Sequence, residues 1–547
     1  MHTNYIFVTG GVVSGLGKGI TTASIGLILK SKGFKVTAIK IDPYINYDAG
    51  TLRPTEHGEV WVTEDGGEID QDLGHYERFM GETISKDHNI TTGQVYKAVI
   101  DRERSGKYLG KTVQPIPHIT DEIKRRIKVV AEGTKVNFVL IEIGGVVGDY
   151  ENVLFLEAAR QLKMEEKNVI FIHVVYLPIL RSLGEAKTKP TQHSVRALRE
   201  LGIQPDFIVC RSEQEIDEPR IKKISLFCSA KEENIISNPD VKNIYEVPLK
   251  FEDQEFINKI LSKLGLKPRS SNLKVWKKFV DIVNNAEKVI KIGVVGKYVN
   301  IGDYKLPDSY VSVLEAIKHA AATNNVRAEV KWIDAKDFEK DEKNLKILEN
   351  VDGIIVPGGF GSLGVEGKIK AIRFARENKI PYLGLCFGLQ LAVVEFARHV
   401  CNLDNAHSTE IDENTPHPVI DFLPWQKEHI SQSKYGATMR LGGQITEIKP
   451  NTLAQKLYGK KQIIERFRHR YEINPKHIEL LEKNGFVFSG EADKKYTKGE
   501  RVMQIGELRD HPFFIGSQFH PEFTSRPLRP NPLFKGFIKA VVKRKFK

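Results

Sequence analysis

The chain has 547 residues, of which 41% are hydrophobic and 28% are charged, and its formal net charge is +12. This length is too great for one hydrophobic core, and the composition excludes the disordered, fibrous and low-complexity classes. The positive charge is spread along the chain apart from a terminal cluster at Lys543 to Lys547, so it favours a solvated surface and polyphosphate ligands over nucleic acid as a partner.

The N-terminus and the cysteines indicate the cellular compartment. The first strand-like run starts near Tyr5 without a basic and apolar leader, and the longest apolar run, near Asn168 to Leu180, is broken by a histidine and a proline. No CxxC pair is present, which argues against a disulfide framework or a zinc site; the cysteines are Cys210, Cys228, Cys386 and Cys401. We therefore expect a cytoplasmic protein without a signal peptide or a membrane span.

The first half of the chain alternates apolar, strand-like runs with helical patterns. The strand-like runs are Tyr5 to Thr9, Lys35 to Ile41, Val136 to Ile143, Val169 to Leu177, Phe207 to Cys210 and Ile224 to Phe227. Because these runs are continuously apolar, they predict an open, mostly parallel sheet that helices cover on both faces. We expect a first domain at 1–266 and an interdomain linker at 267–288, which includes an amphipathic stretch from Lys274 to Ala286.

The second half, 289–547, shows a similar series. Its strand-like runs are Val289 to Val295, Ala328 to Ile333, Val351 to Val356, Pro381 to Leu385, Phe486 to Ser489 and Phe513 to Phe519. Several of them end in glycine-rich turns, which predicts a second open α/β sheet with ligands at the carboxyl ends of its strands. The proline-containing stretch Asp412 to Tyr435 is predicted to be a surface excursion inside this domain.

A glycine-rich stretch, Gly10 to Gly26, follows the first strand and opens a helix. Gly17 and Lys18 fit the phosphate loop G-x-x-x-x-G-K-[ST], but Gly11 lies one place too early and Gly19 replaces the hydroxyl residue that binds magnesium. A turn that only caps a helix is the alternative, which the density of glycines between a strand and a helix disfavours. Magnesium would then need other oxygen ligands, for which the candidates are Asp72 and Glu142.

Two further stretches contain residues typical of binding or catalytic sites. The loop Gly184 to His193 gathers lysines, threonines and a glutamine that can bind a second triphosphate, although its composition also suits a hydrophilic surface loop. In the second domain, Cys386 lies between Gly384 and Gly388 at a strand-to-helix turn, as in a nucleophile elbow, where a helix N-terminus favours the thiolate. A buried structural cysteine is the alternative.

A candidate base and an orienting carboxylate favour the interpretation of Cys386 as a nucleophile over that of a structural cysteine. His520 and Glu522, in QFHPE, complete a set for acyl transfer with Cys386, and the backbone amides of Pro357 to Gly361 offer an oxyanion hole.

Together these motifs resemble the CTP synthase family from end to end. The motifs that carry the likeness are GGVVSGLGKG, KIDPYIN, DLGHYERF, PHITDEIK, EIGGVVGDYE, KTKPTQHSV, LPDSY, PGGFG, GLCFGLQ, HSTE, TMRLG, RHRYE and QFHPE. The resemblance implies a P-loop NTPase-like amidoligase (synthetase) domain that phosphorylates the 4-oxygen of UTP with ATP, and a class I glutamine amidotransferase domain. Ammonia, released from glutamine or supplied free, would displace the phosphate to give CTP for pyrimidine biosynthesis.

The resemblance also implies roles for individual residues. Catalysis would depend on Lys18, Cys386, His520 and Glu522, and Mg2+ would be bound by Asp72 and Glu142. ATP would contact Gly15, Leu16, Gly17, Lys18, Gly19, Ile20, Asp72, Asp240 and Val241. UTP, or CTP as feedback inhibitor, would contact Ser14, Asp149, Tyr150, Glu151, Lys187, Thr188, Lys189, Pro190, Thr191, Gln192 and Lys223. Glutamine would contact Gly359, Phe387, Gly388, Leu389, Gln390, Glu410 and Arg470.

The resemblance further implies a homotetramer and GTP as an allosteric activator, with three departures from the family pattern. Leu363 replaces a lid arginine associated with GTP activation, Phe387 replaces a leucine, and Val146 and Tyr150 alter the motif near the CTP site. One alternative is another P-loop amidoligase with a glutaminase domain, similar to cobyric acid synthase, against which the KTKPTQHSV loop argues. A binding or filament-forming protein with a spent glutaminase is a second alternative, and the intact nucleophile set speaks against it.

Overall fold

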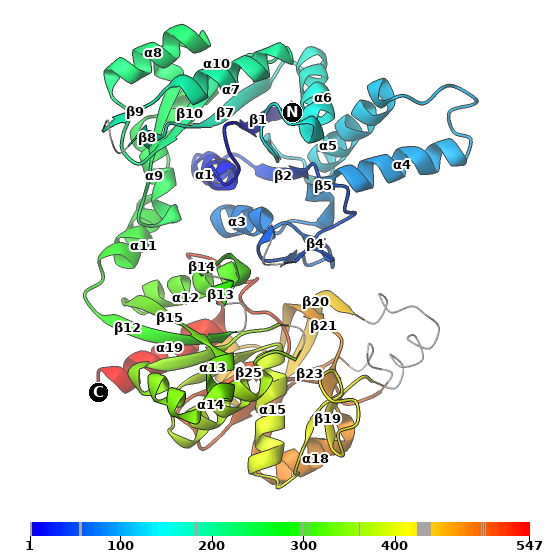
Figure 1. The fold of residues 1–547 in the computed structure, drawn as a ribbon, viewed down its shortest axis with the longest axis vertical. Coiled ribbons are helices and arrows are strands. Elements are labelled where there is room, and N and C mark those ends of the chain that lie inside the picture. Colours follow the sequence, from blue (N-terminus) through cyan, green and yellow to red (C-terminus); the bar gives the residue numbers. More distant parts are fainter. Residues whose placement is uncertain are drawn as a thin grey trace. The chain divides into compact units, whose positions relative to one another are not determined.

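The structure is a computed structural model that describes residues 3–53, 57–180, 184–296, 300–301, 304–305, 307–359, 362–423, 439–493, 495, 497 and 499–547. It divides into two compact units, each built on its own sheet (Figure 1). Unit 1 comprises Met1–Thr51 and Glu68–Val280, and unit 2 comprises Leu52–Gly67 and Asp281–Lys547. The short segment Leu52–Gly67 thus belongs with the second half of the chain, although it lies in the first half of the sequence.

Unit 1 is organised by a seven-stranded sheet in which every neighbouring pair is parallel. In spatial order its strands are β11 (Ile235–Pro239), β10 (Phe207–Ser212), β7 (Val169–Tyr176), β1 (Asn4–Gly10), β6 (Phe138–Ile143), β2 (Val36–Asp42) and β5 (Asn89–Thr91). Nearly all of their residues are buried, as continuous apolar strands require. Because all strands run the same way, the loops after their carboxyl ends meet at one edge of the sheet.

Helices cover both faces of this sheet. The helices of this unit are α1 (Lys18–Ser31), α3 (Gln71–Met80), α4 (Thr92–Arg104), α5 (Thr120–Thr134), α6 (Val153–Glu165), α7 (Lys189–Glu200), α8 (Glu218–Cys228), α9 (Val247–Asp253) and α10 (Phe256–Lys263), followed by α11 (Lys274–Asn285), which crosses the unit boundary after Val280. Short pieces complete the unit: β4 (Glu68–Ile69), β8 (Ile179–Leu180) and β9 (Glu185–Ala186). The amphipathic stretch expected at Lys274 to Ala286 forms α11, and Trp276 is buried and donates to Tyr245 O at 2.8 Å.

The strand predicted at Ile224 to Phe227 is wrong, because these residues lie in α8. Ile224 and Cys228, four residues apart, are buried, whereas Leu226 and Phe227 are 76% and 54% exposed. This spacing is that of one helix face, and a four-residue apolar run does not distinguish a helix from a strand. The strand that pairs with β10 is β11, later in the chain.

Unit 2 contains a nine-stranded mixed sheet. In spatial order its strands are β15 (Arg327–Asp334), β12 (Val289–Gly296), β16 (Gly353–Val356), β17 (Tyr382–Leu385), β25 (Phe514–Ser517), β24 (Met503–Leu508), β23 (Phe486–Ala492), β20 (Arg440–Ile448) and β21 (Gln462–His469). The first five pair in parallel and the rest pair antiparallel. The predicted two-domain α/β fold class is confirmed, and an antiparallel half that was not predicted extends the second sheet.

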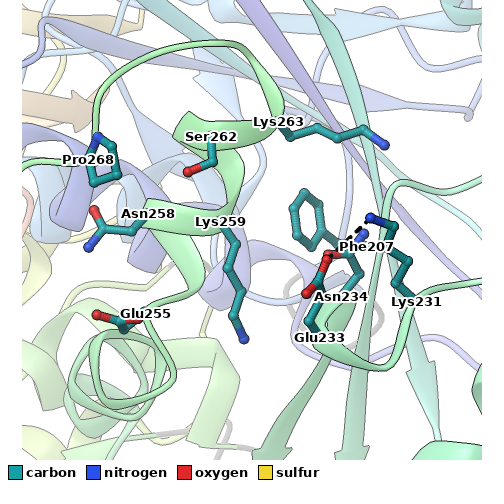
Figure 2. A pocket seen from close by; sticks show the side chains of 10 residues that line it. All are labelled: Phe207, Lys231, Glu233, Asn234, Glu255, Asn258, Lys259, Ser262, Lys263 and Pro268. Carbon is teal, nitrogen blue, oxygen red and sulfur yellow. Dashed lines mark ion pairs between the residues drawn. The ribbon is translucent and has the colours of Figure 1, made fainter.

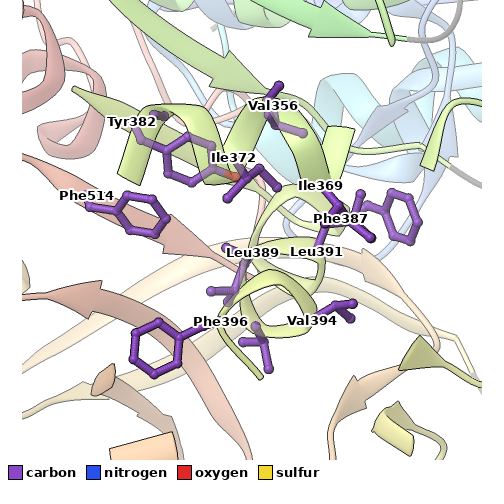
Figure 3. Packing of buried hydrophobic residues seen from close by; sticks show 14 of the residues in the cluster. Val356, Ile369, Ile372, Tyr382, Phe387, Leu389, Leu391, Val394, Phe396 and Phe514 are labelled. Atoms are coloured by element: carbon purple, nitrogen blue, oxygen red, sulfur yellow. The ribbon is translucent and has the colours of Figure 1, made fainter. Parts of the chain in front are cut away.

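Two of the hydrophobic clusters in the described part of unit 2 are large. One core includes residues of α14 (Val365–Glu377) and α15 (Phe387–His399), and Figure 3 shows Phe387, Leu389 and Leu391 packing there around the start of α15. The other core includes residues of α12 (Val311–Thr323) and α19 (Pro532–Lys545). The remaining elements are β3 (Trp61–Val62), β13 (Asn300–Ile301), β14 (Tyr304–Lys305), α13 (Ala335–Lys340), β18 (His407–Ser408), β19 (Pro418–Asp421), α17 (Leu453–Tyr458), β22 (Glu472–Ile473) and α18 (Pro475–Lys483).

The excursion predicted at Asp412 to Tyr435 is described only in part. Its first residues include β19, which pairs with β18 and β22, and its residues from 424 onward lie outside the described part of the chain. Across the helices that the structure describes, none combines the length and the apolar character needed to cross a membrane.

Candidate functional site

The loop after β1 has the backbone of a phosphate-binding turn. Gly15 and Gly17 have φ angles of 74° and 81°, in the left-handed region that residues with a Cβ rarely adopt. The helix α1 begins at Lys18, so its unpaired N–H groups and the positive end of its dipole lie directly after the loop. Backbone amides in this arrangement bind anions.

Lys18 is positioned at this loop by the turn that follows β6. Its side chain is 8% exposed, and Nζ donates a hydrogen bond to Gly145 O at 3.0 Å. Burial lowers the pKa of Lys18, and the negative charge of Glu142 opposes this shift. The acceptor of this hydrogen bond is a neutral carbonyl, which a phosphate oxygen would outcompete because charge-assisted hydrogen bonds are stronger.

Gly19, which replaces the usual hydroxyl residue, leaves room for Asp72. A Cβ on Gly19 would lie 2.4 Å from Asp72 Oδ1, a distance that close packing does not allow. Asp72 lies in the first turn of α3, where Asp70 caps the helix by accepting a hydrogen bond from Asp72 N at 2.8 Å. An oxygen from α3 therefore occupies the place where the usual loop supplies one from α1.

Lys40, on β2, joins the two carboxylates that the sequence assigned to magnesium. Its ammonium donates to Glu142 Oε1 at 2.7 Å and also to Asp72. Burial alone would lower the pKa of Lys40, but Asp72 and Glu142 outweigh it and hold the pKa well above its ordinary value. Two carboxylates thus converge on one buried cation.

This donor set fits Mg2+, which prefers carboxylate and phosphate oxygens. Within the ranges that the structure describes, no group of three or more acidic, histidine or cysteine side chains is arranged to hold a metal alone. Water molecules and the phosphate oxygens of a nucleotide would complete the shell around Asp72 and Glu142. Lys40 was not among the predicted site residues, although a lysine within an apolar strand is a signal, because a buried charge needs a partner.

A buried histidine links the loop to α7. The ring nitrogens of His173 lie 2.9 Å from Thr9 Oγ1 and 2.7 Å from Ser194 Oγ, and burial lowers the pKa of His173 to about 3, so the ring is neutral at physiological pH. A Cβ on Gly11 would lie 1.5 Å from Ser194 Oγ, so α7 packs directly against the start of the loop. The sequence analysis missed His173, which has no motif signal of its own.

Because α7 packs there, the predicted triphosphate-binding stretch lies beside the phosphate loop. Lys189, Pro190, Thr191 and Gln192 form the first turn of α7, and Gln192 Nε2 donates to Thr188 Oγ1 at 3.1 Å. Lys187 donates to Glu185, whose pKa is lowered by this bond and, more weakly, by Lys223 on α8. The structure thus brings Lys187 and Lys223 near the same carboxylate.

The other residues predicted in unit 1 lie along the same edge of the sheet. Asp149, Tyr150 and Glu151 follow β6, and Tyr150 is 97% exposed. Asp240 and Val241 follow β11 directly, and Asp240 pairs with Arg211 Nη2 at 2.7 Å. Of the loop residues, Ser14 and Gly15 are exposed, Leu16 and Lys18 are buried, and Ile20 lies in α1. The strands β10 and β7 separate Asp240 from the phosphate loop in the sheet.

A pocket of about 470 Å³ lies elsewhere in unit 1 (Figure 2). It is lined from β10, α10 and the turn before β11, and Lys231 pairs there with Glu233 at 3.5 Å. Phe207 begins β10, so the pocket lies at the amino ends of the strands, opposite the edge that carries the phosphate loop. It contains none of the residues predicted to bind a nucleotide.

In unit 2, Cys386 lies on a strained turn between β17 and α15. Its φ of 51° and ψ of −102° are unusual for a residue with a side chain, and it is the N-cap of α15. A Cβ on Gly388 would lie 2.1 Å from Val356 O, so glycine is needed for the helix to start this close to β16. The geometry is that of a nucleophile elbow, as the sequence predicted.

His520 and Glu522 lie beside this elbow. His520 Nδ1 is 2.7 Å from Glu522 Oε1, and a Cβ on Gly358 would lie 3.1 Å from His520 Cε1 and 3.5 Å from Cys386 Cβ. Burial lowers the pKa of His520, but the charges of Glu522 and Cys386 outweigh it and raise the pKa to about 10. The imidazole therefore stays protonated at neutral pH, next to the thiol that it would help to ionise.

The predicted glutamine-binding residues come from four segments of unit 2. Gln390 Nε2 donates to Tyr471 O at 2.8 Å, so the first turn of α15 contacts the loop that carries Arg470. Phe387, Gly388 and Leu389 are buried in that turn, and Glu410 follows β18, in the small sheet that contains β22. Gly359 is described, whereas Phe360 and Gly361 of the predicted oxyanion hole lie outside the described residues.

Sequence reasoning missed two supports of this site. Gln518 Nε2 lies 3.6 Å from Cys386 Sγ, although only His520 and Glu522 of its motif were assigned a role. His469 Nε2 and Arg440 Nη1 both lie within 2.7 Å of Glu472 Oε1, forming a buried cluster that holds the loop of Arg470. Charged residues within strands β20 and β21 were the available signal.

Two family descriptions match the chain. The family described as CTP synthase N-terminus matches residues 4–266, and the family described as glutamine amidotransferase class-I matches residues 305–540.

Full-length relatives extend this match. A CTP synthase from Thermococcus gammatolerans is 56% identical over 546 residues, which cover 100% of this chain and 99% of the relative. A CTP synthase from Pyrococcus furiosus is 57% identical over 541 residues, 98% of each chain, and one from Thermus thermophilus is 51% identical over 540 residues, 98% of this chain and 96% of the relative. Among solved structures, a Trypanosoma brucei CTPS glutaminase domain with bound acivicin is 34% identical and covers 46% of this chain and 94% of that one, with a TM-score of 0.43, too low to support an argument about the fold.

Proposed function

The chain belongs to the CTP synthase family, and we propose that each of its units performs one half of the glutamine-dependent synthesis of CTP from UTP. It is a glutamine-hydrolysing carbon–nitrogen ligase of pyrimidine biosynthesis. Full-length identity to named CTP synthases disfavours the cobyric acid synthase alternative. Contacts within each unit support the assignment of the individual steps to particular residues of this chain.

Unit 1 activates UTP. The phosphates of ATP would lie on the amides of Gly15 to Ile20, and Lys18 would leave Gly145 O to neutralise the phosphoryl group as it moves. The γ-phosphoryl group passes to the 4-oxygen of UTP, which releases ADP. Ammonia then adds at C4, and the phosphate leaves with the former 4-oxygen while the nitrogen loses a proton, which gives CTP.

Asp72 and Glu142 would hold Mg2+, which supplies charge neutralisation at the phosphates when it is bound. Both carboxylates also accept from Lys40, so a metal held by the same oxygens would compete with the Lys40 ammonium for them.

The spacing of the strands supports the assignment of Asp240 and Val241 to the ATP site. Asp240 and Val241 directly follow β11, which lies three strand spacings from β1, or about 14 Å at about 4.8 Å per strand. An extended nucleotide with its phosphates on the loop reaches that far, so these residues suit the adenine side of ATP. Ser14, Lys187 to Gln192 and Lys223 would bind UTP, and Asp149 to Glu151 would bind the cytosine side of CTP as feedback inhibitor.

Unit 2 releases ammonia. The Cys386 thiolate attacks the amide carbon of glutamine, His520 protonates the departing nitrogen, and water then cleaves the thioester to give glutamate. Glu522 holds the imidazole, and backbone amides near Gly359 would stabilise the oxyanion. Glutamine itself would be bound by Phe387 to Gln390, Glu410 and Arg470.

The observation that most strongly supports the proposed function is the strained Cys386 elbow beside the His520–Glu522 pair. The same chain also contains a phosphate loop that Asp72 completes. The test is to incubate the purified chain with UTP, ATP, Mg2+ and either glutamine or ammonia, and to follow CTP by its absorbance. We expect CTP from both nitrogen donors. Hydrolysis of glutamine without any conversion of UTP would contradict the proposal.

Regulation and assembly are further parts of this proposal. GTP activation, CTP feedback, a homotetramer and a cytoplasmic location are what the family likeness suggests. Leu363, which replaces the expected arginine, is 64% exposed, so it offers no cation to a GTP phosphate. We therefore expect a weak response of glutamine-dependent synthesis to added GTP, measured beside a Leu363→Arg variant, and a tetramer in sedimentation with UTP and ATP.

A further inference from the structure

The segment Leu52–Gly67 belongs to unit 2, although the sequence on both sides of it folds in unit 1. Its described residues are anchored at two places in unit 2. Glu59 accepts a hydrogen bond from Ser312 N, at the start of α12, at 3.0 Å. Glu64 O accepts from Gly443 N on β20 at 2.7 Å. These contacts fix both ends of β3, which lies between them.

β3 packs against the residues that support His520. Trp61 is 1% exposed, and its ring lies 5.0 Å from the ring of Phe523. Phe523 in turn stacks on the imidazole of His520, with the ring centroids 5.2 Å apart and the planes at 19°. The indole is therefore the outer layer of a stack whose inner layer is the imidazole of His520, the proposed proton donor.

A second path reaches the backbone of His520. The guanidinium of Arg466 lies 5.4 Å from the Trp61 ring and donates to Val62 O at 3.0 Å. Arg466 O accepts a hydrogen bond from His520 N at 2.8 Å. The segment thus supports both the ring and the main chain of the same histidine, whereas Glu522 restrains only Nδ1.

We propose that Trp61 is a positioning residue for glutamine hydrolysis, which holds His520 in line with Cys386 through Phe523 and Arg466. The inference rests on the proposed function of His520. A ring held only at Nδ1 can tilt, and a misplacement of about 1 Å at a reacting group can cost about 100-fold in rate. In the sequence, Trp61 belongs to the synthetase half, yet it acts in the glutaminase.

The test compares Trp61→Leu with Trp61→Phe in the full chain. Trp61→Leu removes the layer behind Phe523, so we expect kcat for glutamine hydrolysis to fall by about tenfold to 100-fold. The KM for glutamine should stay within about twofold, because Trp61 does not line the predicted glutamine site, and ammonia-dependent CTP synthesis should stay near the wild-type rate. Trp61→Phe keeps an aromatic layer and should restore most of the activity.

A pH profile separates positioning from a general loss of stability. The groups that face His520 electrostatically are Glu522, Cys386 and His469. If the imidazole tilts away from Glu522 and Cys386, the alkaline limb of the glutaminase profile should move to lower pH in Trp61→Leu. Phe338→Leu is the matched control, because Phe338 is equally buried in unit 2 but lies in α13, within the core of α14 and α15.

Three results would overturn the inference: an unchanged kcat in Trp61→Leu, an equal loss of the ammonia-dependent rate, or the same loss and pH shift in Phe338→Leu. A wild-type chain that does not hydrolyse glutamine at all would instead contradict the proposed function. The two failures are therefore distinguishable.

Discussion

The two sites are prepared for their substrates in opposite ways. Around the phosphate loop, charges are balanced by contacts between side chains: Lys18 donates to a carbonyl, and Lys40 lies between Asp72 and Glu142. At Cys386 the arrangement is fixed by backbone, by a strained φ of 51° and by the close approach of Gly388 to Val356 O. A nucleotide and its metal would therefore compete with side-chain contacts at the first site, whereas the turn at Cys386 is set by the backbone itself.

The chemistry explains this difference. Phosphoryl transfer requires a metal and phosphates that arrive with the substrate, so the protein must hold its carboxylates neutralised until then. Acyl transfer uses only groups of the chain, so they can be fixed in advance. Substitutions should accordingly separate the two nitrogen routes when they affect unit 2, and should stop both routes when they affect unit 1.

The largest effect is expected from Cys386→Ala. Without the thiolate no thioester forms, so glutamine-dependent synthesis should fall by about 10⁴-fold or more. Synthesis from added ammonia should remain, because the elbow takes no part in activating UTP. Cys401→Ala is a control, since this half-buried cysteine follows α15 and should change neither rate. Loss of both routes together in Cys386→Ala would contradict the division of labour between the units.

Lys18→Ala should stop both routes. The ammonium stabilises charge on the transferring phosphoryl group, so its loss should lower the rate with glutamine and with ammonia alike by about 10²- to 10³-fold. Lys30→Ala is the matched control, because Lys30 lies on the same helix and pairs with Glu82 away from the loop. A Lys18→Ala chain that still makes CTP from ammonia at the wild-type rate would refute the assignment.

Much of both sites could be predicted from the sequence because local patterns fix local backbones. A strand followed by Gly15, Gly17 and Lys18 predicts a turn and a helix start, and Gly384 and Gly388 around Cys386 predict an elbow, without knowledge of distant residues. The loops after the predicted parallel strands also had to meet at one edge of the sheet.

The features that the sequence did not reveal depend on partners distant along the chain. Lys40 becomes part of the site only because Asp72 and Glu142 converge on it, and Trp61 belongs to unit 2 only through contacts with residues such as Phe523. Strands β20 and β21 mix buried, half-buried and exposed residues and contain charged side chains, so they lack the continuous apolar runs that identified the parallel strands. The Ile224 to Phe227 run was misassigned because a short apolar run fits either structure.

Gly19→Ser tests whether the replacement of the loop hydroxyl by Asp72 can be reversed. The added side chain would start 2.4 Å from Asp72 Oδ1, so it should displace the carboxylate rather than supplement it. We expect both nitrogen routes to fall by about 10- to 100-fold and to need more Mg2+. Gly133→Ser is the matched control, since a Cβ there meets no atom within 4 Å. A Gly19→Ser chain with unchanged rates and Mg2+ dependence would show that Asp72 does not fill this role.

The smallest expected effect concerns the pH dependence of glutamine hydrolysis at the Cys386 site. Glu522 and Cys386, against the effect of burial, raise the pKa of His520 to about 10, so the imidazolium that protonates the departing amide nitrogen should persist until the pH approaches that value. Glutamate release should therefore decline on its alkaline side near pH 10, and in Glu522→Gln this limb should move to lower pH.

The raised pKa of His520 also makes the stability of unit 2 depend on pH. Because the pKa of His520 is higher in the folded chain than its ordinary value of 6.5, the ion pair stabilises unit 2 fully below pH 6.5, and that stabilisation is lost as the pH rises toward 10. The difference in urea midpoint between wild type and Glu522→Gln should shrink over this interval. Glu507→Gln is the control, since Glu507 is also buried but accepts hydrogen bonds from Leu453 N and Ala454 N, so its effect should not vary between these pH values. A difference for Glu522→Gln that stays constant from pH 6 to pH 10 would mean that the pair is not charged in the folded chain, and glutamine hydrolysis would then need another proton donor.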